Sequence, residues 1–460
     1  MNITDIYQLF LKHNNITTDS RHCPPNSIFL ALKGKNFNGN AFANNALQHG
    51  CSYAIIDQPS FAIHSDKRYI LVDDCLSTLQ QLAHLHRQKL NTTVLAITGS
   101  NGKTTTKELL ATVLSTKYNV LYTQGNLNNH IGVPITLLQL THKHNIAIIE
   151  MGANHPGEIN TLAHIAAPNH ALITNVGRAH LQGFGSLQGV IRAKGELYDY
   201  IKAHRPNGFI FLNSDDPLLI NMANHRNLTN RIYYGTHPNP KNSVTATLTS
   251  SSPFLNFKWH SSLNNPTLNP LHIVNSHLFG SYNIYNFLAA AAVAHFFNIH
   301  DNLISTALAN YIPLNNRSQL TRTPNNTLIL DSYNANPSSM DAAIRNFALI
   351  NAHNKMVILA QMDELGSHAS LEHRKILNLL LHSNIPHIWL VGKLFIDAAN
   401  SPLNTTTPQS LNNSQHSPQL LLFDNIDNLM QHISTNMPRN KFILLKGSHS
   451  SQLFQLAKLL

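Results

Sequence analysis

Short apolar runs alternate with stretches of helical periodicity along residues 1–90, which predicts a small α/β unit. Helical spacing is clearest over residues 77–89, and the polar segment 90–93 predicts the end of this unit. The runs that predict its strands are SIFLAL, SYAIID and RYILVD.

From residue 94 a strand–loop–helix pattern repeats, and its apolar runs are continuous instead of alternating with polar residues. Such runs are typical of strands buried on both faces, so parallel βαβ units are expected. The segment 243–275 differs, because its short stretches with Pro and Ser predict an antiparallel appendage. The runs that predict the parallel strands are VLAIT, NIAIIEM, HALITNV and GFIFLN.

A helix is predicted over residues 283–297, and a second boundary follows at 313–317. Five further apolar runs, each followed by a helical segment, predict a doubly wound carboxy-terminal unit: TLILDS, KMVILA, HIWLVG, QLLLF and KFILLK. The polar tract 401–419 predicts a surface loop. The sequence therefore predicts an α/β protein of three domains, over residues 1–90, 91–314 and 315–460.

The composition points to small anionic ligands. Of 460 residues only 12% are charged, about half the share of an average globular chain, and Asn, Ser, Thr and 29 His supply the polarity. The histidines have no common spacing, so their number predicts no metal site. Lys and Arg total 32 against 22 Asp and Glu, a formal charge of +10, but the basic residues are scattered. This distribution argues against a nucleic-acid surface.

No targeting or membrane segment is evident. The amino-terminal stretch MNITDIYQLFLKHNN has no basic leader before an apolar run, and no window approaches the roughly 18 apolar residues of a membrane span. We expect a soluble cytoplasmic protein, without membrane insertion, and a monomer. Cys23, Cys51 and Cys75 lack CxxC spacing, so free thiols are expected instead of a disulfide framework or a zinc site.

The strongest chemical signal is TGSNGKTTTKE, which directly follows VLAIT and opens an amphipathic helix. Gly99 and Gly102 allow backbone N–H groups to approach phosphate oxygens, and the start of the helix adds its positive dipole. Lys103 is placed to reach the terminal phosphates and Thr104 to bind magnesium. Ile97 stands where the general motif has glycine, so the loop is a variant. The expected nucleotide is ATP.

This loop alone does not identify a reaction, because motors, switches, kinases and ligases share it. Glu150 ends the apolar run IAIIE, so its carboxylate is expected at the carboxyl end of a parallel strand, where ligands and magnesium bind. His180 and Lys194 lie beyond the following strand. Taken alone, each of these two residues is more typical of an ordinary His or Lys on the protein surface.

Six strings together resemble the Mur ligase family, in a consistent order along nearly the whole chain. The most specific are IEMGANHPGEI and DSYNANPSSMDAAI, which are typical of the branch that adds D-alanyl-D-alanine. Other Mur ligases and folylpolyglutamate synthases share the phosphate loop but not these two strings. The remaining four are TGSNGKTTTKE, GNLNNHIGVPITLL, ITNVGRAHLQGFGS and AKGELY.

The resemblance implies an amino-terminal domain that binds the UDP end of a sugar nucleotide, a central P-loop ATPase with a parallel sheet, and a Rossmann-like carboxy-terminal domain that binds the acceptor dipeptide. It implies that ATP phosphorylates the terminal carboxylate of UDP-N-acetylmuramoyl-tripeptide in peptidoglycan precursor synthesis. The amine of D-alanyl-D-alanine then attacks the acyl phosphate. Both steps gather negative charge that cations must offset. The third tripeptide residue, meso-diaminopimelate or lysine, stays open.

Roles for individual residues follow from the same resemblance. Lys103, Thr104 and Glu150 would hold the phosphates and a first magnesium ion. His180 and Lys194 would hold a second ion, the lysine as its carbamate. The implied nucleotide contacts are Gly99, Ser100, Asn101, Gly102, Lys103, Thr104, Thr105, Asn283, Asn286, Arg317 and Asp331. The implied contacts of the sugar nucleotide are Ser20 and Arg21, and those of the acceptor are Asn334, Asn336 and Lys446, although a strand-end turn would equally explain Lys446.

The chain departs from the family pattern at seven positions, none of them in the phosphate loop or among the expected magnesium ligands. They bear on substrate affinity more than on the chemistry. These positions are Asn38, Asn40, Tyr282, Asn316, Ala360, Gln361 and His449.

Two alternatives remain at the level of the sequence. Another Mur ligase or a folylpolyglutamate synthase would share the loop, and DSYNANPSSM argues against both. An ATP-driven switch that binds nucleic acid is favoured only by the charge of +10. A gel shift with plain DNA or RNA that weakens steeply with salt would identify such a switch.

Overall fold

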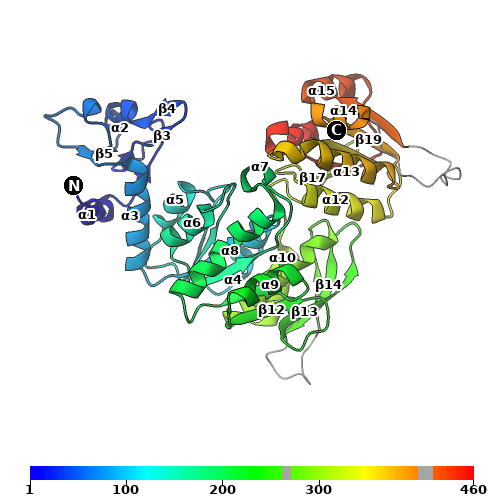
Figure 1. The fold of residues 1–460 in the computed structure, drawn as a ribbon, viewed down its shortest axis with the longest axis horizontal. Helices are drawn as coiled ribbons and strands as arrows, with labels where there is room; N and C mark the ends of the chain where they lie inside the picture. Colours follow the sequence, from blue (N-terminus) through cyan, green and yellow to red (C-terminus); the bar gives the residue numbers. More distant parts are fainter. Residues whose placement is uncertain (262–270, 402–417) are drawn as a thin grey trace.

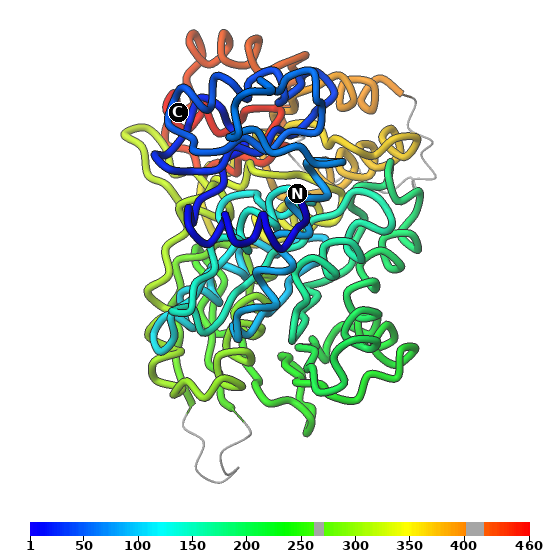
Figure 2. The backbone as a smooth tube through the Cα atoms, turned by 90° about the vertical axis from the view of Figure 1, so that its left-hand side faces the viewer, coloured from blue at the N-terminus to red at the C-terminus, as the bar shows by residue number. Residues whose placement is uncertain are grey.

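A computed structural model describes residues 1–261, 271–401 and 418–460. Three large sheets follow one another along the described residues, one in each of three units. Figure 1 shows the amino-terminal and carboxy-terminal units above opposite ends of the central one. In the perpendicular view of Figure 2 these two units overlap at the same height. Most of the predicted surface loop 401–419, and residues 262–270 of the predicted appendage, lie outside the described residues.

The amino-terminal unit has a four-stranded parallel sheet in the order β1-β2-β5-β6. The three predicted strands are confirmed, and the two-residue β1 is an addition. Cys51 and Cys75 are buried here, and Cys23 is partly exposed; all three are free thiols, as expected. The strands are β1 (Ile16–Thr17), β2 (Ile28–Leu30), β5 (Tyr53–Ile56) and β6 (Tyr69–Leu71), with a hairpin of β3 (Lys33–Gly34) and β4 (Phe37–Asn38). The helices are α1 (Ile3–His13), α2 (Ala43–Gln48) and α3 (Cys75–Lys89).

The central unit has a nine-stranded sheet in the order β15-β14-β13-β12-β11-β10-β7-β9-β8. The four predicted strands, β7, β9, β10 and β11, are confirmed and pair parallel. The strands β8 and β12, which were not predicted, extend the parallel part, and β13 pairs parallel with β12. Antiparallel pairing is confined to β13, β14 and β15. The predicted antiparallel appendage is therefore not separate, because β13 hydrogen-bonds to β12 and continues the main sheet. The strands are β7 (Thr93–Thr98), β8 (Val120–Tyr122), β9 (Ile146–Glu150), β10 (His170–Ile173), β11 (Ile210–Asn213), β12 (Arg231–Gly235), β13 (Asn242–Ser250), β14 (Asn256–Ser261) and β15 (His272–Asn275).

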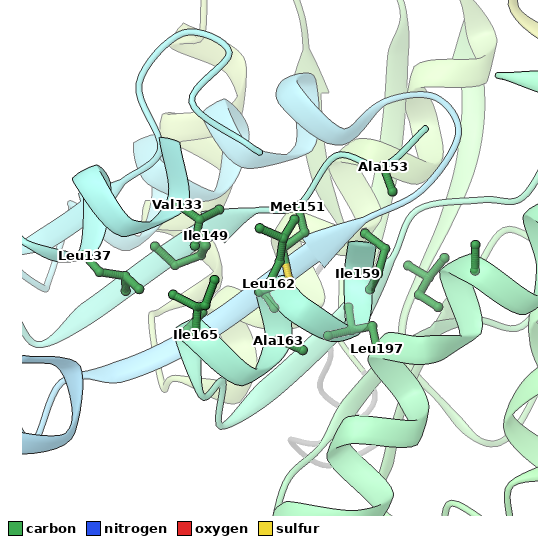
Figure 3. Close-up of a cluster of buried hydrophobic side chains, with 14 of the residues drawn as sticks. Val133, Leu137, Ile149, Met151, Ala153, Ile159, Leu162, Ala163, Ile165 and Leu197 are labelled. Atoms are coloured by element: carbon green, nitrogen blue, oxygen red, sulfur yellow. The ribbon is translucent and has the colours of Figure 1, made fainter. Parts of the chain in front are cut away.

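Helices cover both faces of this sheet. Side chains alternate between the faces along a strand, so Ile148 of β9 packs with α4 and α10, while Ile149 packs with α5, α6 and α8. Figure 3 shows part of the cluster that contains Ile149, in which Ile149 and Met151 lie near Val133 and Leu162. The helices are α4 (Lys103–Leu114), α5 (Gly132–Leu137), α6 (Glu158–Ala166), α7 (Leu181–Phe184), α8 (Leu187–His204), α9 (Pro217–His225), α10 (Ile284–Phe296) and α11 (Asp301–Asn310).

The carboxy-terminal unit has a six-stranded sheet in the order β16-β17-β21-β18-β19-β20. The five predicted strands are confirmed and parallel, and β16 adds an antiparallel edge that was not predicted. No helix among the described residues combines the length and apolar character needed to cross a bilayer. The strands are β16 (Gln319–Arg322), β17 (Thr327–Asp331), β18 (Lys355–Ala360), β19 (His387–Val391), β20 (Gln419–Phe423) and β21 (Phe442–Lys446). The helices are α12 (Pro337–Leu349), α13 (Ala369–Leu381), α14 (Lys393–Asn400) and α15 (Ile426–Thr435).

Candidate active site

The phosphate loop connects β7 to α4, as its sequence predicts. Gly99 and Gly102 have φ angles of +146° and +79°, which side chains with a Cβ rarely adopt. A Cβ on Gly99 would overlap Thr174 Oγ1, and one on Gly102 would lie 2.6 Å from Asn286 Oδ1. Both glycines are thus required by backbone conformation and by close neighbours.

Lys103 begins α4 and folds back over the loop. Its Nζ donates to the carbonyl oxygens of Gly99 at 2.7 Å and Ser100 at 3.2 Å. Burial lowers the pKa of Lys103, and the negative charge of Glu150 partly opposes that shift. The ammonium group is therefore held at the loop by neutral carbonyls, available to an anionic ligand.

Glu150 is the last residue of β9, as predicted, and is only 1% exposed. Thr104 Oγ1 donates to its Oε2 at 3.0 Å, and Asn128 Nδ2 donates to its Oε1 at 2.8 Å. Lys107 Nζ, fully buried, lies 4.0 Å from Oε2. Asn128 was not predicted; it lies in GNLNNHIGVPITLL, a string that by itself indicated no role.

A cavity of about 1150 Å³ opens above the loop between the central and carboxy-terminal units. It brings together most of the predicted residues from both units. These are Ser100, Asn101, Gly102, Lys103, Thr104, Thr105, Glu150, His180, Asn283, Asn286, Arg317, Asp331, Asn334, Asn336 and Lys446. Four predicted residues in the described part of the chain do not line the cavity. They are Ser20, Arg21, Gly99 and Lys194.

Two predicted residues of the carboxy-terminal unit form an ion pair at one wall. Lys446 Nζ lies 2.6 Å from Asp331 Oδ2, and the lysine is 2% exposed. Arg317 stacks its guanidinium 3.7 Å from the centre of the Tyr333 ring. Its Nε has no hydrogen-bond partner within the described residues. Asp331, expected on the nucleotide side, and Lys446, expected on the acceptor side, are thus joined directly.

His180 and Lys194 have different surroundings. His180 adopts a φ of +51° and binds Glu364 of the carboxy-terminal unit through Nδ1. This hydrogen bond lowers the pKa of Glu364. Lys194 on α8 is 1% exposed, and its Nζ lies 5.6 Å from the centre of the Phe184 ring. Burial, and secondly the charge of Lys103, lower the pKa of Lys194 to about 7.

Ser20 and Arg21 lie in the turn after β1, away from this cavity. The side chain of Arg21 is 89% exposed and pairs with Asp19 at 2.9 Å. Hydrogen bonds from Arg21 lower the pKa of Asp19 to about 2. An exposed arginine held in a bidentate pair presents its remaining N–H donors to solvent.

Several departures from the family pattern have local explanations. Asn316, at a position where glycine is usual, has a φ of +55°, a conformation that asparagine tolerates better than most residues. The hydroxyl group of Tyr282, which lines the cavity, hydrogen-bonds to Ser318 Oγ at 3.2 Å. Gln361 Oε1 accepts from Leu394 N at 3.3 Å, away from the cavity lining.

The other departures fall into two groups. Asn38 and Asn40 belong to a polar network in the amino-terminal unit, in which Asn40 Nδ2 donates to Asp57 Oδ1 at 2.8 Å. His449 lines the cavity and packs edge-on against Tyr333. Ala360, 1% exposed, contributes to the core of the carboxy-terminal sheet.

Three family models match successive parts of the chain: the Mur ligase family catalytic domain at residues 12–87, the Mur ligase middle domain at 97–294, and the Mur ligase glutamate ligase domain at 316–449. A UDP-N-acetylmuramoyl-tripeptide–D-alanyl-D-alanine ligase of Buchnera aphidicola is 34% identical over 96% of this chain and 90% of its own. The ligase of that name from Escherichia coli is 36% identical over 82% and 81%.

The fold agrees with these matches. A crystal structure of MurF from Acinetobacter baumannii superposes with a TM-score of 0.81 at 31% identity, covering 97% of this chain and 93% of that one. The resemblance inferred from the six sequence strings is confirmed along nearly the whole chain. This chain belongs to the Mur ligase family.

Proposed function

We propose that this chain is an ATP-dependent ligase that joins D-alanyl-D-alanine to UDP-N-acetylmuramoyl-tripeptide in peptidoglycan precursor synthesis, acting as a cytoplasmic monomer. One structural observation carries the proposal: the phosphate loop, buried Glu150 and the first turn of α12 line a single cavity. A nucleotide on the loop is therefore within reach of both units that the reaction requires. The names of relatives 34% and 36% identical support this choice of acceptor.

The chemistry follows from the weakness of a carboxylate as an electrophile. An oxygen of the tripeptide carboxylate attacks the γ-phosphorus of ATP, the bond to the β,γ-bridging oxygen breaks, and ADP leaves. The amine of the dipeptide then attacks the acyl carbon, and the tetrahedral adduct loses phosphate and a proton to give the amide. Negative charge gathers on oxygen in both steps, and Lys103 and Arg317 supply cations at the cavity.

Thr104 and Glu150 would hold one magnesium ion. A hydroxyl and a carboxylate 3.0 Å apart are hard oxygen donors of the kind magnesium prefers, and the carboxylate faces the cavity beside the loop. When bound, the ion would offset charge on the phosphoryl oxygens. Lys103 would contact the same phosphates.

His180 and Lys194 would hold a second ion only if Lys194 is carbamylated. An ammonium repels a cation, whereas a carbamate supplies oxygen donors and negative charge. The low pKa of Lys194, about 7, supports this modification, because attack on carbon dioxide requires the neutral amine. The competing possibility is that Lys194 stays a cation and contacts a phosphate directly.

The two other substrates would be bound by different units of the chain. Ser20 and Arg21 in the amino-terminal unit would bind the uridine end of the sugar nucleotide. Asn334 and Lys446 would face the acceptor dipeptide from the carboxy-terminal unit. Asn283 and Asn286 would hold the adenosine part of ATP or contact its phosphates.

Phosphate release from ATP tests this function directly. The assay would combine ATP, UDP-muramoyl-tripeptide and D-alanyl-D-alanine, and would omit one component at a time. We expect release only with all three, since the acyl phosphate turns over only when the amine arrives. Tripeptides ending in meso-diaminopimelate and in lysine would be compared. Equal release without the dipeptide would contradict the proposal.

A further inference from the structure

The first turn of α12 contacts the phosphate loop although the two are far apart in sequence. Asn336 Nδ2 donates to Asn101 Oδ1 at 2.7 Å, and Asn336 is 6% exposed. An amide–amide hydrogen bond at this distance is well formed. The carboxy-terminal unit is therefore attached directly to the middle of the loop.

A second route connects the same two segments. Ser338 Oγ accepts from the backbone N–H of Arg178 at 3.0 Å. The preceding Gly177 exchanges hydrogen bonds with Ser100 Oγ, its N–H at 2.9 Å and its carbonyl at 3.1 Å. Both middle residues of the loop, Ser100 and Asn101, are thus linked to the start of α12.

The backbone of Asn101 is already held by the central sheet. Its N–H donates to Asn175 Oδ1 at 3.0 Å, and its carbonyl accepts from Thr174 Oγ1 at 2.6 Å and Asn175 Nδ2 at 2.9 Å. The Asn101 side chain is the part that reaches α12. Asn101 therefore joins the end of β10 to the carboxy-terminal unit.

The amide oxygen and the amide nitrogen of Asn336 make different hydrogen bonds. Oδ1 caps α12 by accepting from Ser339 N at 2.9 Å, and Nδ2 binds Asn101. Serine and aspartate also cap helices well, but neither supplies an amide donor that reaches Asn101. The capping task and the contact with the loop can thus be separated by substitution.

We propose that Asn336 is a positioning residue for ATP, which holds the side chain of Asn101 in the phosphate loop against the first turn of α12. This inference deepens the proposed function, because it assigns Asn336 a task toward ATP in addition to the acceptor role implied by the family resemblance. ATP affinity depends on this contact.

The test is the dissociation constant of a non-hydrolysable ATP analogue with magnesium, measured without tripeptide or dipeptide. Asn336→Ser retains the cap, adds no charge and loses the donor, so we expect weaker binding by about 3- to 10-fold, the effect of one hydrogen bond. The matched control is Asn425→Ser. Asn425 caps α15, accepting from Asn428 N at 3.0 Å, and lies outside the cavity lining.

A double-mutant cycle with Asn101→Ala identifies the contact itself. If the two side chains act together, Asn336→Ser should weaken nucleotide binding little further in the Asn101→Ala protein. Additive losses, an unchanged dissociation constant in Asn336→Ser, or an equal loss in Asn425→Ser would each overturn the inference. Binding is measured without turnover, so failure here is distinct from failure of the proposed ligase reaction, which the three-substrate assay detects.

Discussion

Glu364 of the carboxy-terminal unit accepts a hydrogen bond from Nδ1 of His180 in the central unit, so one ring nitrogen of a proposed magnesium ligand is already occupied. The Nε2 atom remains for the cavity, which His180 lines. Histidines that bind metals commonly donate their other ring N–H to a carboxylate, which sets the ring orientation. Because Glu364 belongs to the other unit, this orientation requires the two units to be docked.

Replacing Glu364 with Gln should therefore weaken magnesium activation by about 10- to 100-fold, the usual cost of losing such a carboxylate. The measurement is the magnesium dependence of phosphate release. Asp341→Asn serves as the control, because Asp341 forms a surface ion pair with Arg345 on α12. Identical magnesium curves for Glu364→Gln and the parent protein would refute an orienting role.

Lys103→Ala should lower turnover by about 10² or more, the effect of losing one preorganised electrostatic contact. Lys103 is held at the loop by the carbonyls of Gly99 and Ser100, so its loss removes charge at a defined position. Rates would be measured at saturating ATP. Lys117→Ala, at an exposed side chain bonded to Asn298 O, should leave the rate nearly unchanged. A full rate in Lys103→Ala would contradict the proposed phosphate contact.

Arg21→Ala should raise the KM for the sugar nucleotide and leave that for ATP nearly unchanged, because Arg21 lies outside the cavity above the phosphate loop. Arg68→Ala is a matched control, since Arg68 lies in the same unit and pairs with Asp66 in the same manner. Initial rates at varied substrate concentrations give both constants. An unchanged KM for the sugar nucleotide would rule out this placement of the uridine end.

Lys194→Ala should be nearly inactive and partly restored by small carboxylic acids. A carboxylate refills the oxygen donors of a carbamate, whereas an amine would replace only an ammonium. The assay is phosphate release with added acetate or with added alkylamine at matched ionic strength. Rescue by alkylamines but not by carboxylates would instead identify Lys194 as a cation that binds phosphate.

Acid should destabilise the central unit partly through His170. Burial among phenylalanines lowers the pKa of His170 to about 4, so between this value and the ordinary 6.5 the unfolded chain binds the extra proton. Stability therefore falls as pH decreases through this window, by at most about 1.4 kcal/mol per pH unit. Urea unfolding midpoints at pH 7 and pH 5 should differ less for His170→Phe than for the parent. Equal differences would exclude His170 as the cause.

The sequence was sufficient for features that depend on neighbours in the chain. Buried parallel strands such as β7, β9 and β18 are continuous apolar runs, and the phosphate loop is a contiguous motif whose glycines and lysine act within one turn. Glu150 was placed correctly because a strand's last residue must emerge at the carboxyl edge of a parallel sheet. Strands with few buried residues were missed, among them β1, β8, β12 and β16, because they contain no continuous buried apolar run.

The tertiary structure decided the contacts between residues that are distant in sequence. The pairs Asn101–Asn336 and His180–Glu364 depend on how the carboxy-terminal unit docks, and no local pattern encodes that geometry. The burial that lowers the pKa of Lys194 likewise comes from packing around α8, because desolvation is a property of the assembled interior and not of the lysine itself.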